Sequence, residues 1–371
     1  MDILTQLGDL FGNVLHFTWQ QGFMILIGAA LITLAIKREM EPTLLLPMGF
    51  GAILVNLPGV NTEAIKTLFD AGISSELFPL LLFIGIGAMI DFGPLLSNPK
   101  MMFFGAAAQF GIFFTLILAT LFGFSLNDAA SISIIGAADG PTSIVAATKL
   151  QSNYLGAIMV AAYSYMALVP IIQPPFIRLV TTRKERLIRM EYNPKAVTKT
   201  TKILFPIFVT IVAGAIAPES AQLIGFLMFG NLIRECGVLN SLSDTAQNVL
   251  ANLITLLLGF TVALSMKAEQ FVTLETFLIL GLGLVAFIFD TIGGVLFAKF
   301  LNLFLKQKMN PMIGAAGISA FPMSSRVIHK MGLKEDPYNY LLMHAAGANV
   351  SGQIASVLAG GLLMSIVLGW K

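Results

Sequence analysis

The sequence predicts an all-α polytopic membrane protein, and three observations carry this prediction. The chain has 371 residues, of which 56% are hydrophobic and only 11% charged. Its mean hydropathy is +0.84, far above that of soluble domains. Its apolar residues are gathered in long runs, and a spanning helix needs about 20 such residues. A bilayer, rather than one large core, therefore accounts for this much apolar surface.

About ten of these runs are candidate membrane-spanning helices. We expect them at residues 19–36, 43–57, 77–90, 101–122, 154–172, 203–217, 221–233, 249–265, 277–305 and 340–368. Two further apolar stretches, residues 129–150 and 312–331, are interrupted by Gly, Pro, Ser and Thr. Irregular backbone at membrane depth is tolerated only where protein or a water-filled cavity satisfies its polar groups. We therefore predict two re-entrant or discontinuous segments, called here the first and second broken segments.

The basic residues indicate how the spans are oriented. Residues 178–202, the basic loop, contain eight Lys and Arg against two Glu, and cytoplasmic loops are enriched in Lys and Arg. We therefore place the basic loop in the cytoplasm. Counting spans outward from it puts Lys100 and Arg234 on the same side and leaves Lys149 and Lys267 as exceptions.

The order of the spans repeats within the chain. The motif Ile-Gly-Ala-Ala occurs at residues 135–138 and again at 313–316, and Phe-Gly at Phe50 recurs at Phe229, with offsets of 178 or 179 residues. A shared offset, with a broken segment in each half, predicts an internal repeat.

The two predicted repeats are residues 1–200, which include an N-terminal segment and the basic loop, and residues 201–371. Each holds an odd number of spans, five, so the halves must be inverted relative to each other. The broken segments would then enter from opposite faces and meet near the midplane, where secondary transporters place substrate and ion sites.

The first broken segment contains one carboxylate, Asp139, beside Gly140-Pro141 and the hydroxyls of Thr142 and Ser143. A charged side chain at a helix centre costs about 3 kcal/mol on insertion scales. We interpret Asp139 as a sodium ligand or proton carrier; the structural alternative is a carboxylate that caps a helix break. Oxygen donors of this kind suit a hard cation such as Na⁺.

The last span supplies further oxygen donors. Asn349, Gly352 and Ser356 lie at i, i+3 and i+7, on one helical face, and Ser351 is a further candidate ligand. Packing of small residues explains Gly352 but does not require Asn349. We therefore expect Asn349 and Ser356 at the ion site.

The second broken segment has Gly317 where the first has Asp139. One carboxylate would then serve both halves, with backbone, Ser324 or Ser325 completing the site. Arg326 is either an interfacial anchor or a contact for an anion.

Other polar residues within spans have both functional and structural interpretations. Tyr163 and Tyr165 lie on different helical faces, so only one readily faces the site, where a phenol can assist a proton. Asp290 is a second intramembrane carboxylate, functional or structural.

Composition also excludes several classes of protein. A net charge of +2 gives no indication of nucleic-acid binding, and the single Cys236 excludes an intrachain disulfide or a thiolate zinc site. Residues 1–21 contain no basic residue, so they are not predicted to be a cleaved signal peptide. The chain has no GxxxxGK[ST] motif, so any pumping must use a gradient or chemistry done with partners.

The motifs Gly-Ala-Ala-Asp139-Gly-Pro-Thr142 and Asn349-Val-Ser-Gly-Gln-Ile-Ala-Ser356 resemble those of the β subunit of the bacterial sodium-pumping, biotin-dependent decarboxylases. The resemblance covers essentially the whole chain. It implies that Asp139 is the intramembrane aspartate of the family, Tyr165 its functional tyrosine, and Asn349 and Ser356 its last-helix polar residues. An arginine late in the last helix of some members is missing here, and Arg326 or Lys330 would replace it.

The same resemblance implies the activity and the partners. The chain would release CO₂ from carboxybiotin with uptake of an external proton, and would export Na⁺ across the bacterial cytoplasmic membrane. The implied partners are a carboxyltransferase α subunit, a biotin carrier subunit and a small membrane-anchor subunit, together with membrane lipids and further copies of this chain. The short length of the chain favours, by analogy, the members of this family that belong to acyl-CoA decarboxylases.

Two other functions fit parts of the sequence. A sodium-coupled carboxylate transporter or a Na⁺/H⁺ antiporter would use the same repeat and the same aspartate, but would be active as a single chain. A purely structural membrane anchor leaves Asp139, Asp290 and Asn349 unexplained.

Overall fold

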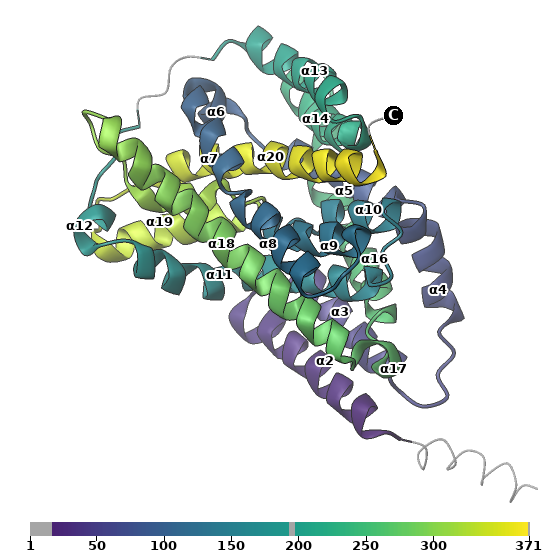
Figure 1. The fold of residues 1–371 in the computed structure, drawn as a ribbon. Helices are drawn as coiled ribbons and strands as arrows, with labels where there is room; N and C mark the ends of the chain where they lie inside the picture. Colours follow the sequence, from purple (N-terminus) through teal and green to yellow (C-terminus); the bar gives the residue numbers. More distant parts are fainter. Residues whose placement is uncertain (1–16, 193–196, 370–371) are drawn as a thin grey trace, which may run out of the picture.

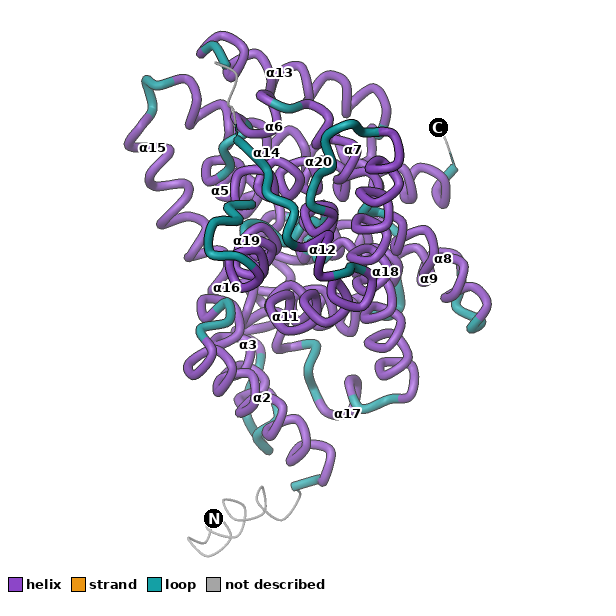
Figure 2. Tube along the Cα trace, turned by 90° about the vertical axis from the view of Figure 1, so that its left-hand side faces the viewer, coloured by secondary structure: helices purple, strands orange, loops and turns teal. Residues whose placement is uncertain are grey.

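The computed structural model describes residues 17–192 and 197–369, and within them every regular element is a helix (Figure 1, Figure 2). The predicted all-α fold is therefore confirmed for this part of the chain. Most of the N-terminal segment predicted not to be a signal peptide lies outside the described residues.

The elements, numbered as in Figure 1, include α-helices, 3-10 turns and two π-helices. In chain order they are α2 (Trp19–Arg38), α3 (Pro42–Val55), α4 (Glu63–Phe69), η1 (Asp70–Ser74), α5 (Leu77–Met89), α6 (Gly93–Ser97), η2 (Pro99–Met101), α7 (Met102–Ala107), α8 (Phe110–Leu121), α9 (Leu126–Ser133), η3 (Ile134–Ala137), α10 (Gly140–Lys149), α11 (Leu155–Val180), α12 (Arg183–Arg186), α13 (Lys199–Ile216), η4 (Pro218–Ser220), α14 (Ala221–Cys236), α15 (Asn240–Asp244), η5 (Thr245–Leu250), α16 (Ala251–Leu264), α17 (Ala268–Phe271), α18 (Leu274–Phe304), η6 (Pro311–Gly317), α19 (Met323–Glu335) and α20 (Leu342–Leu368).

Seven of the described helices are long and apolar enough to cross a membrane, or eight if the bent pair Glu63–Ser74 and Leu77–Met89 forms one span. Every one of the ten predicted runs falls on a helix. However, α3 has only 14 residues and α14 only 16, fewer than the roughly 20 that a perpendicular span needs. The membrane class is confirmed, whereas the count of about ten is not.

Reciprocal contacts join the two halves of the chain. Helix α3 packs on α16, and α14 packs on α5. At these contacts Gly51 lies against Ala263, and Gly230 lies against Ile84, pairs related by the offset that the sequence motifs share. Each half also has a π-helix directly before α5 or α16. These matches support the predicted repeat, whose inverted orientation stays a prediction.

The broken segments lie at the centre of the molecule. Helix α18 packs against η3, η6, α8 and α11, and α20 packs against η6, α7, α10 and α19. In Figure 1, α18 (green) runs diagonally across the front and α20 (yellow) crosses above it. Of the apolar window of α20, 72% is buried, against 17% for α2. The polar residues of α20 therefore face protein rather than lipid.

Ion pairs organise the two ends of the bundle. From the basic loop, Arg186 bonds Glu335 at 2.8 Å and Arg189 bonds Asp336, which ties the loop to the end of α19. Lys149, an exception to the predicted charge distribution, pairs with Glu219 at 3.2 Å. That partner explains how the membrane protein tolerates a lysine there.

Candidate functional site

The first broken segment changes direction at Ala138 and Asp139. Helix α9 continues into the 3-10 turn η3, and α10 begins at Gly140 with Pro141 in its first turn, a position that suits proline. Ala138 adopts a left-handed conformation with φ 52°, and Asp139 is extended. Non-glycine residues rarely adopt this conformation, and such strain is concentrated at functional sites. The predicted discontinuity is confirmed.

The Asp139 carboxylate is buried, with 4% of the residue exposed, and it accepts hydrogen bonds from three different parts of the chain. The amide of Thr142 donates to Oδ1 at 3.2 Å, and the Thr142 hydroxyl donates to Oδ2 at 2.7 Å. The hydroxyls of Ser319 and Ser356 each donate to Oδ2 at 3.0 Å. Hydrogen bonds to a charged group contribute roughly 1.5–3 kcal/mol each, so this set offsets the burial of the carboxylate.

The second broken segment meets the first directly. The amide of Ser319 donates to the carbonyl of Ala137 at 3.1 Å, and Asn349 Nδ2 donates to the carbonyl of Ile318 at 2.7 Å. Between η6 and α19, residues 318–322 are not helical. The predicted meeting of the two broken segments is therefore confirmed.

Small residues permit this close approach. A Cβ at Gly352 of α20 would lie 2.2 Å from the carbonyl oxygen of Gly317. A Cβ at Gly140 would lie 2.3 Å from the ring of Tyr163. The packing interpretation of Gly352 is therefore confirmed. The absence of a side chain at Gly352 lets the second broken segment lie directly against the helix that carries Asn349 and Ser356.

The donor set consists of hard oxygens. One carboxylate and the hydroxyls of Thr142, Ser319 and Ser356 converge, and Asn349 adds Oδ1, a buried oxygen without a hydrogen-bond partner. Each hydroxyl now donates to Asp139 but also has lone pairs that can face a cation. Small hard cations prefer such oxygens. The residues present therefore fit Na⁺.

Four of the predicted ligands or contacts do not reach Asp139 with their side chains. The Ser143 hydroxyl donates to the Asp139 backbone carbonyl at 2.8 Å. Ser324 donates to Gln173 and to the carbonyl of Ala315, and Ser351 donates to the carbonyl of Met101. Arg326 is exposed on α19. Ser324 and Ser351 stay predicted ligands, and in this structure their hydroxyls donate to neighbouring protein oxygens instead of Asp139.

The two tyrosines of α11 have different surroundings, and the functional role of Tyr165 stays a prediction. Tyr165, which the resemblance favours, donates its hydroxyl to the carbonyl of Leu280 on α18. Tyr163 instead packs its ring against Gly140, next to Asp139, and its buried hydroxyl has no partner. Tyr163 is therefore the tyrosine that lies at the helix break.

Sequence reasoning missed Ser319 and Gln173. Gln173 on α11 is fully buried and donates to the carbonyl of Ala315 at 2.9 Å while accepting from Ser324 at 2.9 Å. Ser319 follows Gly317, the repeat partner of Asp139, by two residues, and this proximity was the available signal. No pattern in the sequence singles out Gln173.

A basic cavity of about 540 Å³ opens beside the second broken segment. Its lining includes Met323 and Arg326 from α19 and Pro174 from α11, with one acid, Glu39. Burial raises the pKa of the neighbouring Glu41, and Arg326 opposes this rise. The other cations of the lining are Arg38, Arg178, Lys330 and Lys334.

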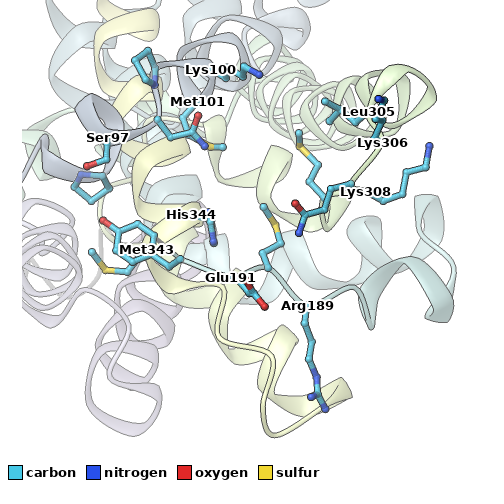
Figure 3. Close-up of a pocket in the computed structure, with 17 residues that line it drawn as sticks. Ser97, Lys100, Met101, Arg189, Glu191, Leu305, Lys306, Lys308, Met343 and His344 are labelled. Carbon is cyan, nitrogen blue, oxygen red and sulfur yellow. The ribbon is translucent and has the colours of Figure 1, made fainter. Parts of the chain in front are cut away.

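A second cavity, of about 640 Å³, lies where the basic loop meets the start of α20 (Figure 3). Four cations line it, Lys100, Arg189, Lys306 and Lys308, against one acid, Glu191, and His344 is buried in its wall. Both cavities are therefore suited to anionic groups.

An all-helical membrane fold, in which two broken helices meet at the hydrogen-bonded carboxylate of Asp139, is typical of ion-translocating membrane proteins. Within this class the family is specific. Residues 20–367 match the family model described as the Na⁺-transporting oxaloacetate decarboxylase beta subunit. The chain therefore belongs to the family of Na⁺-transporting decarboxylase β subunits.

Curated relatives that align with nearly the whole chain support this assignment. The methylmalonyl-CoA decarboxylase subunit beta of Veillonella parvula is 52% identical over 95% of both chains. The glutaconyl-CoA decarboxylase subunit beta of Acidaminococcus fermentans is 50% identical over 95% of both chains. The probable oxaloacetate decarboxylase beta chain of Vibrio cholerae is 43% identical over 99% of this chain and all of that one. The chain is thus a multi-pass inner-membrane component of a sodium-pumping decarboxylase.

Proposed function

We propose that this chain releases CO₂ from carboxybiotin and couples the reaction to Na⁺ export and proton uptake. The observation that carries the proposal is the convergence of Thr142, Ser319 and Ser356 on one oxygen of Asp139. Three parts of the chain must stay together for this site to exist. An ion bound there would therefore be sensitive to any movement between the broken segments and α20.

In the sodium site that we propose, Asp139 supplies the negative charge and the hydroxyls of Thr142, Ser319 and Ser356 supply neutral oxygens. Asn349 Oδ1, which lacks a partner, would complete the set. Ser143 supports the site by binding the Asp139 backbone. Entry of Na⁺ favours loss of any proton held at Asp139, because the cation stabilises the carboxylate.

Carboxybiotin, delivered on a partner subunit, would supply the carboxyl group that leaves as CO₂. The five cations of the cavity around Arg326 fit a carboxylate at its cytoplasmic mouth. When the N–CO₂⁻ bond breaks, its electron pair stays on nitrogen, which takes one proton. Asp139 or Ser356, assisted by a tyrosine, is the proposed source of that proton.

The proposed partners are a carboxyltransferase α subunit, a biotin carrier and a small membrane-anchor subunit, with a homo-oligomer of this chain. The cations around the second cavity give acidic partner surfaces a place to dock on the same face as the basic loop. We propose an acyl-CoA as the ultimate substrate, because three relatives named for acyl-CoA decarboxylases share 48–52% identity and the oxaloacetate relative of Vibrio cholerae 43%.

The test is Asp139→Asn in the assembled complex. Asparagine keeps an acceptor for the Thr142 amide, so we expect a folded complex that loses Na⁺-dependent CO₂ release by roughly 100-fold or more. Asp128→Asn is the matched control, because Asp128 is equally buried but its carboxylate is bonded to Ser125, Ser152 and Asn153. Full coupled turnover by Asp139→Asn would overturn the proposal, and an avidin blot checks for the biotin carrier.

A further inference from the structure

A second carboxylate is buried in the same core. Asp290 lies near the middle of the 31-residue helix α18 and is 0% exposed. None of the salt bridges formed by the described residues includes it. A buried carboxylate without a counter-ion is costly in a membrane protein, and such residues are functional candidates by default.

Asp290 binds backbone amides at an interrupted helix. The span Pro99–Leu121 is broken between α7 and α8, at Ala108 and Gln109. The amide of Gly111, at the start of α8, donates to Asp290 Oδ1 at 2.5 Å. One carboxylate oxygen therefore satisfies a free amide at this helix start.

The other oxygen of Asp290 faces the first broken segment. Oδ2 is buried and has no hydrogen-bond partner among the residues that the structure describes. A Cβ at Gly136 in η3 would lie 2.7 Å from it, so only glycine lets the carboxyl group and the segment approach this closely. Asp290 thus contacts two breaks in helical structure. One is the break between α7 and α8, and the other is the first broken segment, which carries Asp139.

Capping alone does not require an acid here. An asparagine would offer the same single acceptor to Gly111 without placing a second charged oxygen in a dry core. A carboxyl group that holds a proton on Oδ2 is neutral, keeps Oδ1 as the acceptor, and avoids most of this cost. We propose that Asp290 is a second proton-binding carboxyl group of the transport cycle, separate from the sodium site.

The titratable groups on neighbouring elements are directed elsewhere. On α11, Tyr165 donates to the carbonyl of Leu280, a full ten residues before Asp290 on α18. On the first broken segment, Asp139 binds Ser319 and Ser356. On α18 itself, Lys299 pairs with Glu185 at 3.1 Å. Tyr163 packs on Gly140. Asp290 can therefore change its protonation without breaking an ion pair.

This inference rests on the proposed function, in which cleavage of carboxybiotin consumes one proton. The nitrogen of the broken N–CO₂⁻ bond gains that proton from Asp139 or Ser356, and Asp290 goes from carboxylic acid to carboxylate in replacing the proton that the site has lost. Uptake of one proton from the external side restores the acid. Ionised Asp290 binds the Gly111 amide more strongly, so each proton transfer alters the contact between α18 and α8.

The decisive variant is Asp290→Asn, measured in the assembled complex in vesicles beside Asp139→Asn and the control Asp128→Asn. We expect Asp290→Asn to keep the rise in thermal stability caused by Na⁺ but to lose coupled turnover and external proton uptake by roughly 100-fold. If Asp290→Asn keeps wild-type turnover and proton uptake, Asp290 acts only as a helix cap and the proposal is overturned. If Na⁺ does not stabilise the wild-type complex at all, the proposed sodium site fails instead.

A spectroscopic measurement keeps the inference testable if the variant does not fold. Infrared difference spectra of the wild-type complex at saturating Na⁺ should show the carbonyl band of a protonated carboxylic acid that disappears as the pH rises. Asp139 cannot contribute this band while Na⁺ occupies its site. Absence of a sodium-insensitive carboxylic acid band would overturn the proposal.

Discussion

Ser319 binds Asp139 across the junction of the two broken segments. Its hydroxyl donates to Asp139 Oδ2 at 3.0 Å, and its amide donates to the carbonyl of Ala137 at 3.1 Å. Because Ser319 has no helical partner for its amide, the second broken segment is fastened to the first by both its backbone and its side chain. The site therefore exists only while the two segments are in contact.

Removal of the Ser319 hydroxyl should weaken the sodium site. Ser319→Ala deletes one donor to Asp139 and one neutral oxygen, so we expect the apparent affinity for Na⁺ to fall about 10- to 100-fold. The measurement is the Na⁺ dependence of CO₂ release by the assembled complex. Ser325→Ala is the control, because that hydroxyl donates only to the carbonyl of Pro322 at 2.8 Å. An unchanged sodium dependence in Ser319→Ala would remove Ser319 from the site.

Phenylalanine substitutions should separate the two tyrosines. Tyr163→Phe removes a buried hydroxyl that has no partner but lies beside the Asp139 break, so we expect lower coupled turnover with little loss of stability. Tyr165→Phe removes the bond to Leu280, which should cost about 1 kcal/mol in the free energy of unfolding. Turnover assays and thermal melts of both variants in detergent give the comparison. If only Tyr165→Phe loses turnover while remaining fully stable, the tyrosine chosen by the sequence resemblance is the functional one.

Two glycine substitutions should have opposite effects on stability. A Cβ at Gly230 would lie 2.1 Å from the carbonyl oxygen of Ile84, so Gly230→Ala must separate α14 from α5 at a cost of roughly 1–3 kcal/mol. Gly281 has no neighbouring atom within 4 Å of such a Cβ, so Gly281→Ala should stabilise α18 by about 0.5–1 kcal/mol. Equal unfolding midpoints for the two variants would contradict the packing of the two halves.

The contact between the basic loop and α19 should depend on pH. The hydrogen bond from Arg189 holds the pKa of Asp336 below its usual 3.8. The unfolded chain therefore binds more protons in this range, so the stabilisation is complete above pH 3.8 and is lost as the pH falls through the folded pKa. Unfolding midpoints of wild type and Asp336→Asn should converge as the pH is lowered. If the unfolding midpoints of wild type and Asp336→Asn differ by the same amount at every pH, the ion pair between Arg189 and Asp336 makes no pH-dependent contribution to stability.

Much of the site could be predicted because a charged residue in an apolar run is conspicuous. Asp139, beside Gly140-Pro141, marked both the helix break and the candidate ion site, and the motif ending at Ser356 marked the opposing helix. The cost of placing these groups in a membrane leaves few alternatives. Ser319 and Gln173 carried no such mark, because uncharged serine and glutamine commonly form hydrogen bonds between packed membrane segments without any role in ion binding.

The sequence by itself determined the membrane class, the two broken segments and the single carboxylate, because hydrophobic length and helix-breaking residues are local properties. Tertiary structure decided which oxygens meet. The hydroxyls of Ser324 and Ser351 bond other protein oxygens, while those of Ser319 and Ser356 reach Asp139. It also decided that Asp290 faces Gly136. Helix rotation depends on packing against other helices, which is why no spacing along the chain could specify these partners.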